Sequence, residues 1–161
     1  WFYPSSGSTE NDKYVSYNYR ENHWQIGSLN RTAGFDSGPY AYPNYVDDTG
    51  IVYQHEAGYG YDTDTEIFVQ SGPIEIGNGD RYMVAKSLIS DENAPGAVTA
   101  TFKTKNYPTA AESTHGPFTL TSTPTSVRFT GRQVNMRVTG AQNSSWRVGN
   151  MRLDVVPGGK R

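Results

Sequence analysis

Three carboxylates stand at alternate positions in the segment DTDTE: Asp62, Asp64 and Glu66. In an extended segment, alternate side chains point to the same side of the chain. Hard cations such as Ca²⁺ bind several oxygen ligands of this kind. The glycine of an EF-hand loop is missing here, however, and three acids are also typical of a solvent-exposed loop. The spacing therefore leaves two interpretations, a calcium site or, more commonly, a loop without metal, and we expect no other cofactor.

The remaining polar residues form no recognisable catalytic pattern. Four carboxylates could supply the acid and base of glycoside hydrolysis, but their spacing selects no pair. These carboxylates are Glu75, Asp80, Glu92 and Glu112. The histidines His23, His55 and His115 lie far apart, and with no cysteine near them a metal triad cannot be argued from spacing. We therefore expect a protein that is not an enzyme.

Aromatic side chains are the other candidates for a binding site, since they make up 13% of the chain and include twelve tyrosines. Exposed rings can stack on sugars, as in carbohydrate-binding modules, and tyrosine is also enriched at protein interfaces. Both interpretations stay open. The candidates in loops are Tyr40, Tyr42, Tyr59 and Tyr61.

Charge is distributed unevenly along the sequence. The formal net charge is only −2, yet residues 128–161 carry seven cations against the single acid Asp154, so the first 127 residues sum to −8. A basic segment can bind nucleic acid or an acidic neighbouring subunit. We favour assembly because the arginines are spaced along expected strands; the alternative is a solubilising outer face. The candidate interface residues are Arg132, Arg137, Arg147 and Arg152.

Two absences in the sequence narrow the class of protein. The chain contains no cysteine, which excludes disulfide bonds and thiolate catalysis. It also has no apolar run of roughly 18 residues, so we expect no membrane span. A chain of 161 residues is long enough for one domain, or for one domain and part of another.

The hydrophobic pattern predicts an all-β protein. Seventeen glycines and nine prolines interrupt the chain too often for a helical stripe, whereas Val15, Tyr17 and Tyr19 alternate with polar neighbours as in a strand. Residues 1–66 begin with three short antiparallel strands, which have too little core to be stable alone. Residues 67–161 contain about seven short strands, typical of a β-sandwich such as a jelly roll. In the last of these strands, a change of phase at Gly149-Asn150 indicates a β-bulge.

Several phrases resemble the C-terminal part of structural tail proteins of tailed bacteriophages and prophages. They occur in the same order over nearly the whole chain. The phrases are WFYPSSGSTENDKYVSYNYRENHWQIGSLNRTA, GIVYQHEAG, SGPIEIGNGDRYMVAKSLISDE, GRQVNMRVTG and WRVGNMRLDVVPGGKR.

This resemblance implies an architecture and a role. Residues 1–66 are expected to form a partial, propeller-like blade, and residues 67–161 a terminal β-sandwich. The implied function is that of a nozzle-like or hub-like structural component of the virion tail, which acts by assembly with other tail subunits and as a homo-oligomer. Neighbouring blades, expected upstream, would cover Trp1, Tyr3, Tyr17 and Trp24. The resemblance carries over no catalytic residue.

Two other functions stay open at this point. The first is a carbohydrate-binding β-sandwich module for recognition of host glycans, and the second is an enzyme, which we rank below it. Whether the basic end contacts DNA is also open; such binding would weaken steeply with salt.

Overall fold

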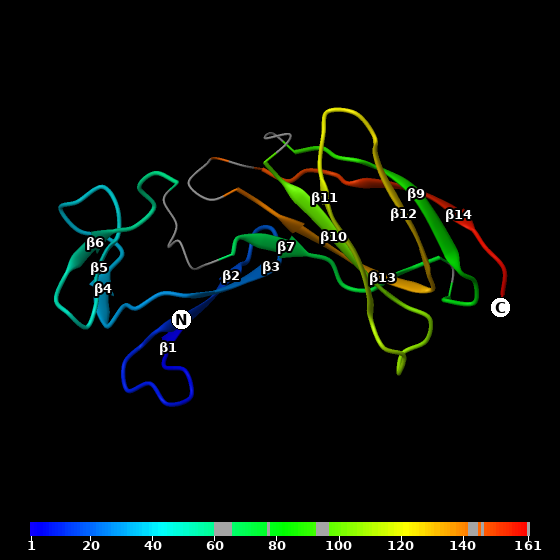
Figure 1. Ribbon diagram of the computed structural model, residues 1–161. Helices are drawn as coiled ribbons and strands as arrows, with labels where there is room; N and C mark the ends of the chain where they lie inside the picture. Colours follow the sequence, from blue (N-terminus) through cyan, green and yellow to red (C-terminus); the bar gives the residue numbers. More distant parts are fainter. Residues whose placement is uncertain (60–65, 77, 93–96, 142–144, 146, 161) are drawn as a thin grey trace. The chain divides into compact units, whose positions relative to one another are not determined.

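The structure, a computed structural model, describes residues 1–59, 66–76, 78–92, 97–141, 145 and 147–160 (Figure 1). All regular elements in these ranges are β-strands arranged in antiparallel sheets, which confirms the prediction of an all-β chain. The chain divides into two compact units. We call Trp1–Thr65 the N-terminal unit and Glu66–Arg161 the C-terminal unit.

The first sheet of the N-terminal unit has the order β1-β2-β3. Its strands are β1 (Phe2–Tyr3), β2 (Lys13–Asn18) and β3 (His23–Ser28). The side-chain amide oxygen of Asn18 accepts hydrogen bonds from the backbone N–H groups of Arg20 and Glu21, and Asn22 takes a positive φ of 55°, so a tight turn joins β2 to β3. This turn fixes a register in which Tyr17 lies opposite Trp24.

The second sheet of this unit, β4-β5-β6, consists of three short strands. They are β4 (Ala33–Phe35), β5 (Asn44–Val46) and β6 (Val52–Gln54). The carboxylate of Asp47 organises the turn between β5 and β6, because it accepts hydrogen bonds from Thr49 N–H at 2.9 Å, Ile51 N–H at 2.9 Å and Tyr53 Oη at 3.1 Å. The hydrogen bonds lower the pKa of Asp47 despite burial, led by the one from the Thr49 hydroxyl. The segment from Asp47 to Ile51 is therefore a hairpin turn held by one carboxylate.

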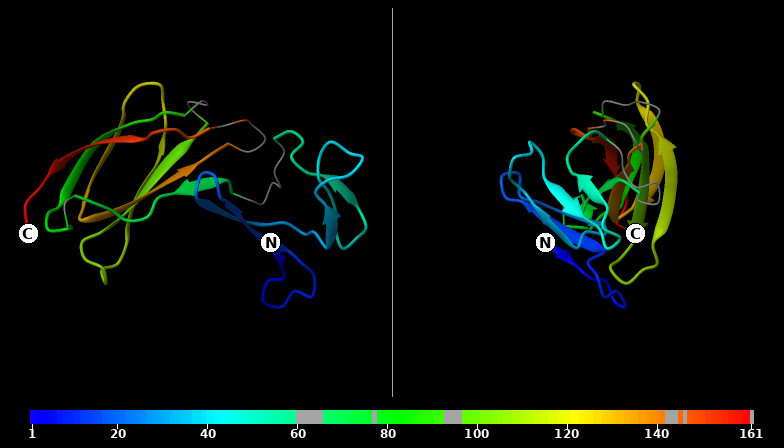
Figure 2. Two further views of the ribbon diagram at one scale, coloured as in Figure 1. Left: turned by 180° about the vertical axis from the view of Figure 1, so that it is seen from behind. Right: turned by 90° about the vertical axis from the view of Figure 1, so that its left-hand side faces the viewer.

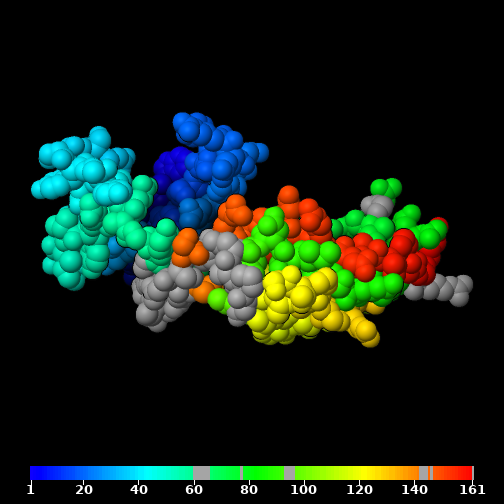
Figure 3. Space-filling view, turned by 90° about the horizontal axis from the view of Figure 1, so that it is seen from above, coloured from blue at the N-terminus to red at the C-terminus, as the bar shows by residue number. Residues whose placement is uncertain are grey.

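The C-terminal unit contains two sheets, one of order β11-β10-β13-β7, with β8 also paired to β13, and one of order β12-β9-β14 (Figures 1 and 2). The strands of the first sheet are β7 (Phe68–Gln70), β8 (Ile74–Glu75), β10 (Thr99–Lys105), β11 (Ser113–Thr119) and β13 (Gln133–Thr139). Those of the second are β9 (Met83–Ile89), β12 (Thr125–Gly131) and β14 (Arg152–Pro157). Figure 3 shows the surfaces of β9 and β14 side by side, in agreement with their pairing.

One hydrophobic core joins the two sheets of the C-terminal unit. Phe102 of β10 is fully buried, and its ring centroid lies 4.7 Å from that of Phe129 on β12. Every second residue of these strands points inward, so each sheet has a buried face and a solvent-facing one. The buried hydrophobic residues are Met83, Ala85, Leu88, Val98, Ala100, Phe102, Leu120, Val127, Phe129, Val134 and Val138. All of them belong to the C-terminal unit, and no hydrophobic side chain is buried among residues 1–59.

The strand pairing also contains the extra residue predicted near the end of the chain. Val148 bridges Glu92, and Arg152 pairs with Ile89. Between these two pairs the chain advances four residues from Val148 to Arg152 but only three from Ile89 to Glu92. One extra residue is therefore inserted at the predicted position. The N–H of Gly149 donates to the carbonyl oxygen of Asp91 at 2.6 Å. Glycine allows this close approach because it has no Cβ atom to collide with Asp91.

Gly149→Ala is expected to destabilise the C-terminal unit by about 1–3 kcal/mol. An added Cβ atom would lie 2.5 Å from Oδ2 and 2.8 Å from the carbonyl oxygen of Asp91, which forces the backbone to shift. Urea denaturation measures the loss. Gly72→Ala is the matched control, because a Cβ atom there meets nothing within 4 Å; equal effects of the two substitutions would contradict the steric explanation.

Candidate interaction surface

The acidic residues proposed as calcium ligands do not form a site within the described residues. Asp62 and Asp64 lie outside them. The carboxylate of Glu66 accepts hydrogen bonds from the guanidinium of Arg137 and, at 3.2 Å, from Thr139 Oγ1. The described ranges contain no group of three or more histidine or acidic residues that could hold a metal ion. Both oxygens of Glu66 therefore have partners within its own unit, and the calcium site stays a prediction.

Two of the four candidate interface arginines make contacts within the C-terminal unit. Arg132 donates to the carbonyl oxygens of Gly79 and Asp80, both at 3.2 Å, and of Lys160 at 2.6 Å. It thereby ties the turn before β9 to the segment after β14. Arg137 forms an ion pair with Glu66, and its guanidinium carbon lies 3.6 Å from the ring centroid of Phe68.

The other two candidate arginines, Arg147 and Arg152, are exposed. The side chain of Arg152 has no hydrogen-bond or ion-pair partner in the described part of the chain. The structure thus places the four arginines in different environments, and their roles at an interface stay predictions.

The loop tyrosines are exposed but are not brought together. Tyr40 is 62% exposed, and its ring centroid lies 6.3 Å from that of Phe35. Tyr42 and Tyr59 are also exposed, and no ring contact in the described part of the chain joins the three. Tyr61 lies outside the described residues. A binding site made of these four tyrosines therefore stays a prediction.

A cluster of apolar side chains forms instead on one face of the sheet β1-β2-β3. Residues opposite each other in paired strands point to the same face. Tyr17 lies opposite Trp24, and Val15 opposite Ile26. Trp1 exchanges two backbone hydrogen bonds with Val15, at 2.8 and 2.9 Å. We call this surface the aromatic face; its members are Trp1, Tyr3, Val15, Tyr17, Trp24 and Ile26.

The aromatic face is largely open to solvent. The ring of Trp24 lies 4.6 Å from that of Tyr17 and 6.1 Å from that of Trp1, so the three rings form one continuous surface. Trp1 is 73% exposed, Trp24 64% and Ile26 71%. Contiguous exposed apolar surface of this kind marks sites of interaction, because leaving it in water is unfavourable.

The opposite face of the same sheet packs within the N-terminal unit. Phe2 contacts Tyr14 at 6.2 Å and Tyr45 of β5 at 5.4 Å between ring centroids. Gly27 has no side chain where the Tyr14 ring lies, and a Cβ atom there would overlap that ring. The N-terminal unit thus covers one face of its first sheet, and its own described residues leave the other face uncovered.

A polar network lies next to Tyr45, the residue of β5 that contacts the covered face. Arg31 Nε donates to Nε2 of His55 at 2.8 Å, and its guanidinium carbon lies 3.9 Å from the Tyr53 ring centroid. The ring of His55 in turn lies 4.5 Å from that of Tyr45. Burial, and secondly the charge of Arg31, lower the pKa of His55. The neutral imidazole is therefore the form that accepts the hydrogen bond from Arg31.

The sequence pointed to the aromatic face through the resemblance to tail proteins, which implies that neighbouring blades cover Trp1, Tyr3, Tyr17 and Trp24. As candidate binding residues it named the loop tyrosines, and their role stays a prediction. The alternation of Val15, Tyr17 and Tyr19 already placed apolar side chains on one side of a strand. Combined with the strand of Trp24 and Ile26, this signal could have located the aromatic face.

The N-terminal unit is expected to lose stability as the pH falls below about 6.5. The folded state resists protonation of His55, whose pKa is lowered from the ordinary value of 6.5, whereas the unfolded chain binds the proton. The contribution of neutral His55 to the free energy of unfolding is fully present above the ordinary pKa of histidine. It declines as the pH falls below that value and levels off below the pKa of His55 in the folded state. Tryptophan fluorescence during urea unfolding, at pH values from about 8 to about 5, measures the change.

His55→Gln should flatten this pH dependence, and His23→Gln, at an exposed position of the same unit, should leave it intact. A profile that is unchanged by His55→Gln would show that another group is responsible.

No known family model matches the chain, and no curated protein matches it either. Within the described ranges, no helix has the length and apolarity needed to span a membrane. The similarity to phage tail proteins therefore stays a prediction that rests on the sequence phrases.

Proposed function

We propose that this chain is a structural component of a bacteriophage tail that acts by subunit assembly, without catalysis. The observation that carries the proposal is the aromatic face, whose apolar side chains no other described part of the N-terminal unit covers. The phrases that resemble tail proteins supply the class of particle. In the particle, strands of neighbouring tail polypeptide would cover the face.

The energetic reason lies in the number of strands. A sheet of three short strands buries too little apolar area for independent stability. Burial of one large apolar side chain contributes about 1.5–3 kcal/mol. Trp1, Trp24 and Ile26 are each more than 60% exposed, so most of this free energy becomes available only when a neighbour covers them. Aromatic residues such as these commonly contribute most of the binding energy of an interface.

Trp24→Ser combined with Ile26→Thr is expected to reduce incorporation of the protein into tails by about tenfold or more. Both new residues keep the strand but remove the apolar surface that a neighbour would cover. Incorporation is measured by quantifying the protein in purified particles and counting complete tails by electron microscopy.

The matched control is Tyr40→Ser combined with Ile51→Thr, which removes similarly exposed side chains, 62% and 55% exposed, outside the aromatic face. Normal tails in the first variant, or equal loss in both variants, would rule out the aromatic face as the assembly surface.

Recognition of host glycans is a second candidate, favoured by the same adjacent rings. Trp1, Tyr17 and Trp24 offer adjacent aromatic rings for stacking against sugars, and the ring centroid of Trp24 lies 6.1 Å from that of Trp1 and 4.6 Å from that of Tyr17. A glycan array distinguishes the two functions. Binding that is lost with Trp24→Ser would support recognition of glycans, and an array without hits would exclude it for the sugars tested.

A further inference from the structure

Eight of the eleven cationic side chains of the C-terminal unit fall into two groups. In the first, the charge is satisfied internally: Lys103 and Lys105 pair with Glu112 at 3.7 and 3.5 Å, and Arg137 pairs with Glu66. In the second, the side chain has neither a hydrogen-bond nor an ion-pair partner in the described part of the unit. The second group comprises Arg81, Lys86, Arg128, Arg152 and Lys160.

Three members of the second group share the outward side of the sheet β12-β9-β14. On β12, Arg128 is exposed between the buried residues Val127 and Phe129. Lys86 is exposed beside the buried Ala85 on β9. Arg152 is likewise exposed on β14 and pairs with the exposed residue Ile89. We call the surface of Lys86, Arg128 and Arg152 the cationic face.

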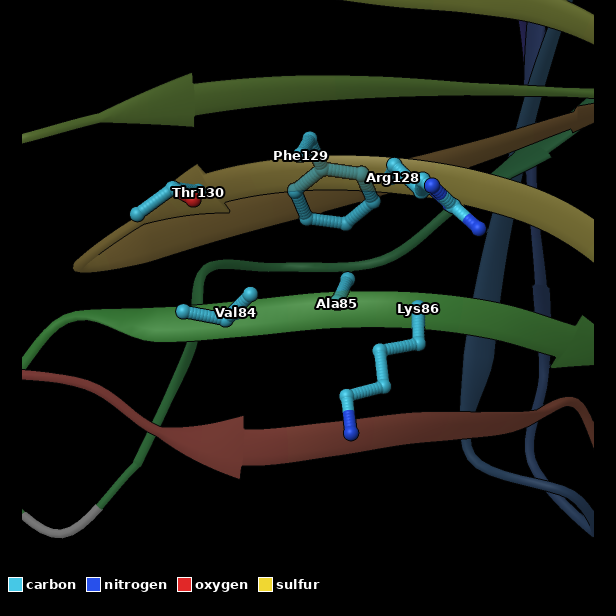
Figure 4. Close-up of a pocket in the computed structure, with 6 residues that line it drawn as sticks. All are labelled: Val84, Ala85, Lys86, Arg128, Phe129 and Thr130. Carbon is cyan, nitrogen blue, oxygen red and sulfur yellow. The ribbon is translucent and has the colours of Figure 1, made fainter.

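An open hollow of about 460 Å³ lies over β9 and β12 at this face (Figure 4). Its lining comes from both strands: Val84, Ala85, Lys86, Arg128, Phe129 and Thr130. The register of the two strands shifts between Ser126 and Phe129, beside Arg128. Such irregularities open a strand pair locally and redirect side chains. The hollow therefore combines an apolar lining with one cation from each strand, and this arrangement suits a carboxylate-bearing surface.

The distribution of charge along the chain indicates which carboxylate-bearing surface would bind at the hollow. The N-terminal unit carries nine acids and three cations, a net charge of −6, whereas the C-terminal unit carries seven acids and eleven cations, a net charge of +4. Several carboxylates of the N-terminal unit are exposed to solvent. They are Glu10, Glu21, Asp36, Asp48 and Glu56.

We propose that the cationic face binds the acidic N-terminal unit of a second copy of this chain. The inference rests on the proposed function, because a subunit that assembles into a tail must contact its neighbours. Complementary charge accelerates association and fixes which surfaces meet. Because the contact joins two different surfaces, repetition of it generates a ring or a filament. It is distinct from the covering of the aromatic face, which depends on apolar burial.

Sedimentation of the purified chain tests the contact. Self-association is expected at about 0.02 M salt and should weaken at about 0.5 M, where exposed charges are screened. Lys86→Glu with Arg128→Glu should raise the dissociation constant by about tenfold or more. The matched control, Arg81→Glu with Lys160→Glu, changes the net charge equally at other positions and should shift it by less than about threefold. Unchanged association of the first variant, or equal loss in both, would overturn the proposal.

Reversal of the opposite charge identifies the partner. A chain with Glu10→Lys, Glu21→Lys and Glu56→Lys should self-associate weakly, and its mixture with the Lys86→Glu, Arg128→Glu chain should associate more tightly than either alone. A mixture that does not associate would overturn the choice of partner. If the wild-type chain binds duplex DNA, and Lys86→Glu with Arg128→Glu abolishes that binding without changing self-association, the face recognises nucleic acid and the proposal is wrong.

The experiments distinguish a failure of the charged contact from a failure of the proposed assembly role. If the charge variants leave self-association intact while Trp24→Ser with Ile26→Thr abolishes incorporation into tails, the charged contact fails and the assembly role stands. If the charge variants prevent self-association while the aromatic variant assembles normally, the aromatic face fails as the assembly surface.

Discussion

A sheet of three short strands has two faces, and the N-terminal unit covers only one of them. Phe2 and Tyr14 pack toward Tyr45 of the second small sheet, and the hydrogen bond between Arg31 and His55 holds that side together. On the other side, Trp1 and Trp24 stay in water. A cluster of apolar side chains of this size seldom stays exposed in the assembled state, because another surface usually covers it. This imbalance is the constraint from which the proposed assembly role follows.

The C-terminal unit solves the same physical problem without help. Its two sheets bury one face each against a common core, in which Phe102 and Phe129 contact across the sheets. The outward faces are then free to carry charge, and the unit uses its cations in two ways. Arg132 and Arg137 tie its own segments together, while Lys86 and Arg128 remain without partners among the residues described. A stable core thus leaves the outer surface of the unit available for contact with other molecules.

Local features of the sequence predicted secondary structure better than they predicted the partners of individual side chains. The strand of Val15 and the bulge at Gly149-Asn150 were predictable, because alternation and a change of phase are local properties of the sequence. The ion-pair partner of Arg137 could not be identified in this way. Its partner Glu66 is 71 residues away, and only the pairing of β13 with β7 brings the two together. The sequence-based prediction treated both residues as free, one for an interface and one for a metal.

The sequence by itself determined that this protein is all-β and where the bulge near its last strand lies. These features follow from residue types that act on the backbone nearby, such as asparagine, glycine and proline. Only the tertiary structure decided which aromatic rings are buried and which charges are satisfied. Burial and pairing depend on strands brought together from distant parts of the chain, so the same tyrosine or arginine can be core, support or open surface.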